Sequence, residues 1–134
     1  MDKKQIARIV FDEDRKLELK VTEEALEICN VSFSSSHDQV CCENVYAEFS
    51  CVEGYITQLK SLYGVRALEI VGVEDMGFLF IAENESGKRV PMLINCYNSQ
   101  NGYYSDNLDL VVTKDGVESK YNLSGSDFIQ HNID

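Results

Sequence analysis

Alternating apolar residues dominate the second half of the chain, and turn-forming pairs interrupt them at intervals. The pairs Ser86-Gly87, Asn101-Gly102 and Asp115-Gly116 separate runs rich in Val, Ile, Leu, Phe and Tyr. Such runs between glycine-containing turns are typical of strands joined by hairpins. The expected strands are 65–73, 78–83, 90–97, 104–113 and 117–123.

The lengths of these three turns also predict how the strands pair. They place Phe80 opposite Met92, Met92 opposite Leu110, and Leu110 opposite Tyr121. The three turns, taken independently, then place the apolar side chains of four strands on the same face of the sheet. This agreement supports the predicted registers. Pro91 disagrees with a central position, because it has no N–H to donate to a neighbouring strand. The sequence therefore predicts a four-stranded C-terminal meander with an irregularity near Pro91.

The segment 52–63, "VEGYITQLKSLY", has the spacing of an amphipathic helix. Ser50 and Glu53 have the spacing of a capping box, and Gly64 follows as a stop signal. The apolar stripe consists of Val52, Ile56, Leu59 and Tyr63. We expect an α+β fold for residues 1–134 as a single domain, with this helix packed on a mostly antiparallel sheet.

The first fifty residues are less regular. A hairpin is expected from strands at 6–11 and 17–21, with a turn at 12–14. The run 26–33 is compatible with a helix or a strand, and a strand is preferred. The run 45–51 is expected to be extended.

The chain of 134 residues has a net charge of −11 and no Lys or Arg between Lys20 and Lys60. Such a surface repels phosphate backbones, so direct nucleic-acid binding is not expected. It would attract a basic protein and speed the encounter. Acidity can also serve solubility alone.

The cysteines favour a reducing compartment. There are five, an odd number, and none has C-x-x-C spacing: Cys29, Cys41, Cys42, Cys51 and Cys96. The start of the chain lacks the apolar run of a signal peptide, and no stretch has the length of a membrane span. We therefore expect a cytoplasmic protein with free thiols and no membrane contact.

Tests for catalytic motifs largely fail. His37-Asp38 before Cys41 and Cys42 could form a thiol nucleophile or a metal site. A polar loop followed by a strand with buried thiols is the interpretation that we prefer. Phosphate-cradling glycine motifs are absent, so we expect no enzyme activity, no metal and no cofactor.

The stretch 98–106, "NSQNGYYSD", is expected to be a hairpin turn that needs Gly102 for a positive φ. Its tyrosines and acid would then stand at the protruding end of the hairpin as a binding patch. Acids of the base-free segment are further candidates. The expected partner-binding residues are Tyr97, Tyr103, Tyr104, Asp106, Asp109, Glu43, Glu48 and Glu53.

The segment 65–112 resembles small bacterial immunity proteins encoded beside polymorphic or contact-delivered toxins. The motif "NGYYSDNLDL" at 101–110 carries most of this resemblance. It implies a cytoplasmic, non-enzymatic inhibitor that binds one toxin domain, often a nuclease with a basic active site. The alternatives are a small ligand-binding or enzymatic α+β domain and an oligomerisation module.

Overall fold

The computed structural model describes residues 3–12, 16–39, 44–49, 53–60, 62–73, 77–100, 108–123 and 129–132. Within these residues the chain forms two sheets and one helix, α1 (Glu53–Lys60). The six-stranded sheet consists of β1 (Lys3–Val10), β6 (Val65–Val73), β7 (Gly77–Asn84), β8 (Arg89–Gln100), β11 (Ile129–Asn132) and β5 (Asn44–Glu48). The five-stranded sheet consists of β10 (Val117–Leu123), β9 (Leu108–Lys114), β4 (Val31–Ser36), β3 (Ala25–Ile28) and β2 (Leu19–Val21).

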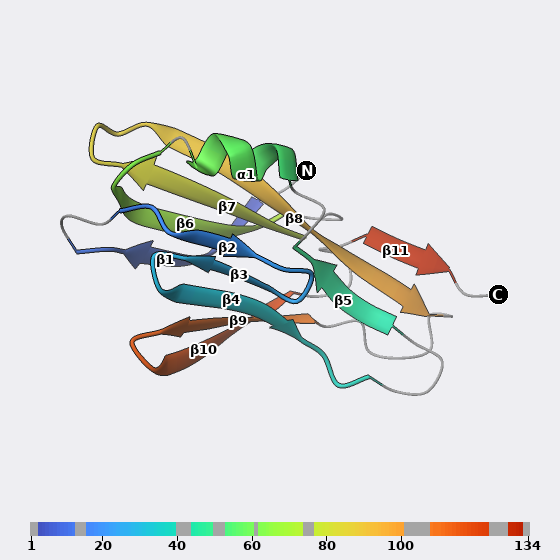
Figure 1. Cartoon of the computed structure of the whole chain (residues 1–134). Helices are drawn as coiled ribbons and strands as arrows, with labels where there is room; N and C mark the ends of the chain where they lie inside the picture. The colour runs from blue at the N-terminus through green and yellow to red at the C-terminus, as the bar shows by residue number, and fades with distance from the viewer. Residues whose placement is uncertain are drawn as a thin grey trace.

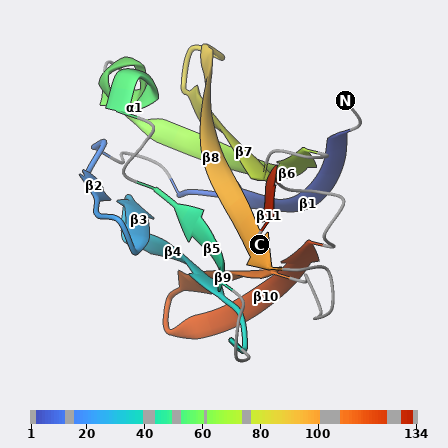
Figure 2. The ribbon, with the colours of Figure 1, turned by 90° about the vertical axis from the view of Figure 1, so that its right-hand side faces the viewer.

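The two sheets form two layers, with α1 at one side of them (Figure 1, Figure 2). Alternate side chains of each layer point inward and join one core cluster, as the two-residue period of strands requires. Phe80 and Met92 enter this cluster from the six-stranded sheet, and Phe33 and Leu110 enter it from the other, all four with no exposed surface. The architecture is therefore a β-sandwich.

Several sequence predictions for the second half are confirmed. Strands β6 and β10 have the predicted bounds. Phe80 pairs with Met92, and Leu110 pairs with Tyr121, in the predicted registers. Short glycine turns fix these pairings because only one strand register fits each turn.

The predicted meander is wrong at its middle step. β8 and β9 belong to different sheets, so Met92 does not pair with Leu110. β9 instead pairs with β4, which places Val112 opposite Phe33. A strand of alternating apolar and polar residues can bury its apolar side chains from either sheet of a sandwich. The alternation of β9 therefore does not predict which sheet it joins. The predicted turn at Asn101-Gly102 lies outside the described residues.

The predicted N-terminal hairpin is also wrong. β1 pairs antiparallel with β6, with Ile9 opposite Leu68, and β2 pairs with β3 in the other sheet. The ambiguous run 26–33 is a hairpin of β3 and β4. Its two-residue turn consists of Cys29 and Asn30, with φ of 49° and 68°. Two successive positive φ values match the twist of a tight hairpin.

The fold class needs a correction as well, because the chain is far richer in strands than an α+β fold with one main helix. α1 has eight residues and lies beside β8. Leu59 and Leu62 are buried, whereas Tyr63, expected on the same stripe, is 70% exposed because the helix ends before it. Among the described residues no helix has the length and apolarity to cross a membrane.

Pro91 lies in the first half of β8, where β7 is the sole neighbour within the described part of the chain. β5 and β11 pair with the second half of β8, from Asn95 onward. The missing N–H of Pro91 therefore does not interrupt a central strand, and the predicted irregularity there is wrong, because β7 and β8 pair through Pro91 without a register shift.

Candidate functional site

A groove of about 550 Å³ lies on the outer face of the six-stranded sheet, where β1 ends. Ala67 on β6 lies between Val10 on β1 and Glu83 on β7 in the strand register. A register shift at Arg66 interrupts the pairing of β6 with β7 beside Ala67. A small side chain next to an irregularity of this kind leaves a hollow in an otherwise closed sheet face.

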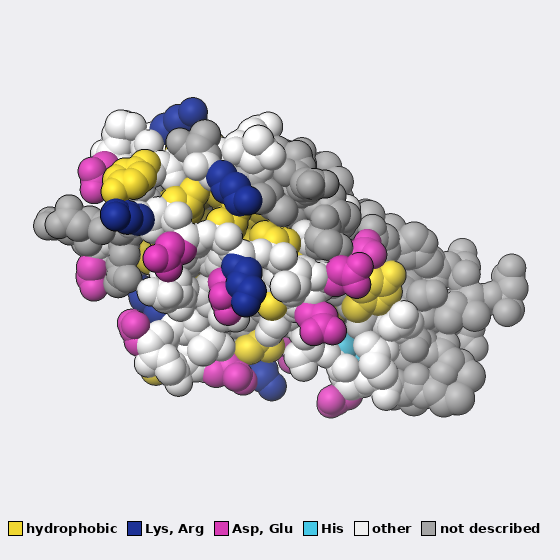
Figure 3. All heavy atoms as spheres, in the orientation of Figure 1, with side chains coloured by type: hydrophobic (Ala, Val, Ile, Leu, Met, Phe, Trp, Pro, Cys, Tyr) yellow, Lys and Arg dark blue, Asp and Glu magenta, His cyan; other side chains and the backbone are white. Residues whose placement is uncertain are grey.

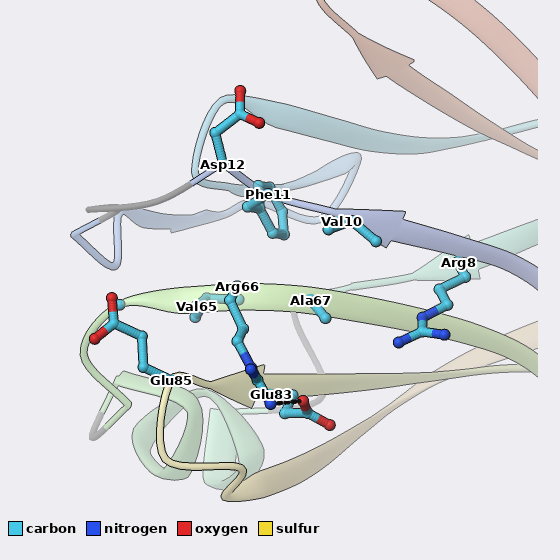
Figure 4. A pocket seen from close by; sticks show the side chains of 10 residues that line it. Arg8, Val10, Phe11, Asp12, Val65, Arg66, Ala67, Glu83 and Glu85 are labelled. Atoms are coloured by element: carbon cyan, nitrogen blue, oxygen red, sulfur yellow. Dashed lines mark hydrogen bonds and ion pairs between the residues drawn. The ribbon is translucent and has the colours of Figure 1, made fainter.

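The two ends of this groove carry opposite charge. Arg8 and Glu85 stand at opposite ends, and the carboxylate of Asp12 points away from both (Figure 4). Val10, which is 58% exposed, is the last residue of β1 and follows Arg8 by two positions. The ion pair of Arg66 and Glu83 lies between the two ends, so charged side chains line the groove along its length.

A chain of alternating charges crosses the same sheet face. Arg66 donates to Glu83 over 2.6 Å, and Arg89 reaches both Glu83, at 3.7 Å, and Glu69. Arg8 contacts Glu69 over 4.0 Å, which is the longest of these pairs. The arginine side chains are 45–60% exposed, so each pair contributes little to stability and mainly orients the side chains.

The free edge of β1 beside the groove is capped by a lysine. The N–H of Phe11 donates to the carbonyl of Arg66 over 2.7 Å, so the preceding carbonyl of Val10 points away from β6. Lys114 Nζ donates to that carbonyl over 2.7 Å and lies 5.8 Å from the centroid of the Phe11 ring. A hollow of about 100 Å³ lies on this other side of Phe11, next to the Cys29-Asn30 turn.

A second feature is a surface rich in acids near β5. In the turn before β3, Thr22 Oγ1 accepts from the N–H of Glu24 over 3.2 Å and from that of Ala25 over 3.0 Å. This turn holds Glu23 and Glu24 exposed to solvent. Ala25 is opposite Ser34 in the sheet, which brings the turn close to the end of β4.

β5 is fixed beside the end of β4 by two side chains. Gln39 donates from Nε2 to the carbonyl of Val45 over 2.6 Å and accepts from the N–H of Val45 over 3.2 Å. Ser35 Oγ accepts from the N–H of Ala47 over 3.4 Å. These bonds hold β5, which ends at Glu48, beside the segment that contains the exposed Asp38.

We use the name acidic surface for Glu23, Glu24, Asp38 and Glu48. Figure 3 shows acidic side chains gathered where β5 lies in Figure 1, without Lys or Arg among the coloured side chains there. The sequence explains this composition, since no Lys or Arg occurs between Lys20 and Lys60. The result is a one-sign charge patch made by three segments of the chain.

Two of the predicted partner-binding residues that the structure describes lie in different sheets. Tyr97 pairs with Tyr46 in the six-stranded sheet. Asp109 lies in the five-stranded sheet, opposite Ser36, where it accepts from Asn122 Nδ2 over 2.9 Å. Glu48 belongs to the acidic surface, and Asp109 lies at its border, opposite the last residue of β4, which precedes Asp38 by two positions.

The other predicted residues are described less fully. The structure places the backbone of Glu53 at the start of α1 and that of Tyr97 in β8, without their side chains. The candidates outside the described residues are Glu43, Tyr103, Tyr104 and Asp106. Cys29 and Cys96 are buried thiols, whereas Cys41, Cys42 and Cys51 lie outside the described residues.

Sequence reasoning missed the groove. Its hollow depends on Ala67 facing outward and on the pairing of β1 with β6, and neither follows from a local motif. No group of three metal-ligating side chains occurs within the described ranges. No protein-family model matches the chain, and neither a curated protein nor a solved structure matches it significantly.

Proposed function

We propose that this protein is an acidic immunity protein that binds and neutralises a basic toxin domain in the cytoplasm. The observation that carries the proposal is the acidic surface, because a one-sign patch on a chain of net charge −11 favours a basic partner. The resemblance of residues 65–112 to immunity proteins supports the same class.

The acidic surface is built from rigid parts, which supports a role in recognition. Glu24 follows the hydroxyl-capped turn of Thr22, and Glu48 ends a strand whose outer edge is bonded to Gln39. Side chains on such supports lose less freedom on binding than those on mobile loops. Carboxylates so placed would stand in for nucleic-acid phosphates at the basic site of a nuclease.

The direct test is co-purification with the product of the neighbouring gene. The expected result is a complex that survives gel filtration and abolishes the activity of the toxin. A neighbouring product that neither binds nor is inhibited would count against the proposal.

A matched pair of variants locates the contact. The triple variant Glu23→Lys, Glu24→Lys and Glu48→Lys should lose the complex. A control triple variant, Glu18→Lys, Glu27→Lys and Glu118→Lys, makes the same change in net charge at exposed positions elsewhere. Equal loss in both would show that net charge alone, not the acidic surface, drives association.

A further inference from the structure

We propose that the outer edge of β10 pairs with the same edge of a second copy of this chain, antiparallel and centred on Ser119. β10 is the last strand of the five-stranded sheet, and among the described strands only β9 pairs with it (Figure 1, Figure 2). A strand with one neighbour presents a row of N–H and C=O groups that a further strand can complete. This inference does not depend on the proposed function.

The turn before β10 determines which of its backbone groups face outward. The two residues of the turn, 115–116, have φ of 52° and 77°, so Lys114 and Val117 flank it as a hydrogen-bonded pair. Hydrogen-bonded and non-hydrogen-bonded pairs alternate along an antiparallel ladder. Every second residue from Val117 onward therefore bonds to β9, and the N–H and C=O groups of Glu118 and Lys120 point away from it.

The side chains of Glu118 and Lys120 carry opposite charges on the outer face of the sheet. Both are exposed, and the ion pairs found among the described residues all lie on the six-stranded sheet. In a pairing centred on Ser119, Glu118 of each copy lies opposite Lys120 of the other. Directly opposite residues share a face, so two pairs of opposite charge form across the new edge.

Val117 gains an apolar neighbour in the same pairing. It is 65% exposed, whereas Tyr121 is partly buried and packs against the core. The pairing places Val117 of each copy opposite Tyr121 of the other, in a non-hydrogen-bonded pair whose side chains approach closely. An aromatic and a β-branched side chain form a favourable cross-strand pair. Apolar contact thus adds to the backbone hydrogen bonds and the charge pairs.

Other registers of the same edge are less favourable. A pairing centred on Glu118 or on Lys120 would place like charges directly opposite each other, which is destabilising. A pairing centred on Tyr121 would place Glu118 beyond Leu123, where the partner strand ends. A shift by one residue would face the outward backbone groups with groups already bonded to β9. The register centred on Ser119 is therefore the self-complementary one.

Sedimentation velocity of the full chain tests the proposal. At physiological salt a Debye length of about 8 Å screens the repulsion between two chains of net charge −11. The expected result is a reversible equilibrium of monomer and dimer that shifts toward the dimer as the protein concentration rises.

Charge variants test the register. Glu118→Lys alone and Lys120→Glu alone should each weaken self-association by about tenfold or more, because each places like charges opposite in both pairs. An equimolar mixture of the two variants should form a heterodimer, since opposite charges then face each other again. Unfolded variants could not be restored by mixing, so this rescue also shows that both are folded.

A matched control and a backbone measurement complete the test. Glu27→Lys makes the same charge change as Glu118→Lys at an exposed position on β3 and should not weaken the dimer. Hydrogen exchange at the amides of Glu118 and Lys120 should slow as the dimer forms, because these N–H groups become bonded across the edge.

Three outcomes would overturn the proposal. They are a monomer at every concentration, a mixture that does not associate, and a dimer whose added amide protection lies outside 117–121. β9 and β4 lie between β10 and the acidic turn before β3, so Glu118→Lys should lose the dimer and still associate with the toxin domain. Failure here is therefore distinct from failure of the proposed function.

Discussion

The rings of Phe33 and Phe80 meet edge to face across the sandwich, with centroids 5.0 Å apart and planes inclined at 80°. Phe33 comes from β4 and Phe80 from β7, so this contact joins the two sheets at the centre of the core. Both side chains are fully buried. An aromatic pair in this orientation gains energy beyond the area that it buries.

Removing either ring should destabilise the fold strongly. Phe33→Ala and Phe80→Ala should each lower the free energy of unfolding by about 3–5 kcal/mol, because each leaves a cavity. A double-mutant cycle with Leu at both positions should show a coupling of about 0.5–1.5 kcal/mol. Denaturant titration measures both quantities. Strict additivity would mean that the rings contribute only by burial.

Gly77 should tolerate no side chain. It has a φ of +142°, and a Cβ there would lie 2.3 Å from the carbonyl oxygen of Ile94. Gly116 also has a positive φ, +77°, but a Cβ there would meet nothing within 4 Å. Gly116→Ala should therefore cost about 1–2 kcal/mol from backbone strain alone. Gly77→Ala should cost more by about 1–3 kcal/mol from overpacking. Equal thermal stability of the two variants would contradict this difference.

The side chain of Gln39 should protect the outer edge of β5 from local opening. Its amide replaces a neighbouring strand for Val45, so Gln39→Ala leaves the Val45 N–H and carbonyl without these partners. We expect a loss of about 1 kcal/mol, at the low end for a partly buried donor. Hydrogen exchange should quicken at the Val45 amide. Gln5→Ala on exposed β1 is the control and should leave that amide unchanged. Unchanged exchange in Gln39→Ala would show that the edge is held in another way.

The thiols of Cys29 and Cys96 should be protected from modification in the native protein. We expect five free thiols by titration under denaturing, non-reducing conditions, in line with the odd number of cysteines. In the native protein Cys29 and Cys96, which are 4% and 0% exposed, should react only as the fold opens. Mass spectrometry after brief alkylation identifies the protected pair. A stable intramolecular disulfide in freshly isolated protein would contradict the prediction.

The turn sequences predicted the β7–β8 and β9–β10 hairpins, but they could not predict which sheet each hairpin joins. The pairs Phe80–Met92 and Leu110–Tyr121 follow from turns that allow one register. The Cys29-Asn30 turn leaves a signal that could have been found, because the apolar alternation changes phase between Ile28 and Val31. A continuous strand cannot change phase without a bulge or a turn.

The candidate site was predictable only in its charge. The absence of Lys and Arg between Lys20 and Lys60 predicts that this segment contributes an acidic patch to the surface. The groove needed the non-local pairing of β1 with β6, since Arg8 and Ala67 are far apart in the chain. Charge composition is local in sequence, whereas a hollow between strands depends on the assembled sheet.

Glu48 and Asp109 should differ in their effect on association with the cognate toxin domain, if the proposed function holds. Glu48 lies within the acidic surface, whereas Asp109 lies at its border and is bonded to Asn122. Charges that steer an encounter act mainly on the association rate and are screened by salt. Glu48→Lys should therefore lower the association rate by about threefold to tenfold at low ionic strength, and Asp109→Lys should lower it less.

Stopped-flow kinetics at low and high salt measures this difference. Glu118→Lys on β10 is the matched control, because it reverses the same charge at an exposed position away from β5. The association rates of all three variants should converge near 1 M salt, where the Debye length falls to about 3 Å. A loss confined to the dissociation rate would mean that Glu48 is buried in the complex rather than steering it. Equal association rates for Glu48→Lys and Glu118→Lys would remove the acidic surface from the encounter and leave net charge as the cause.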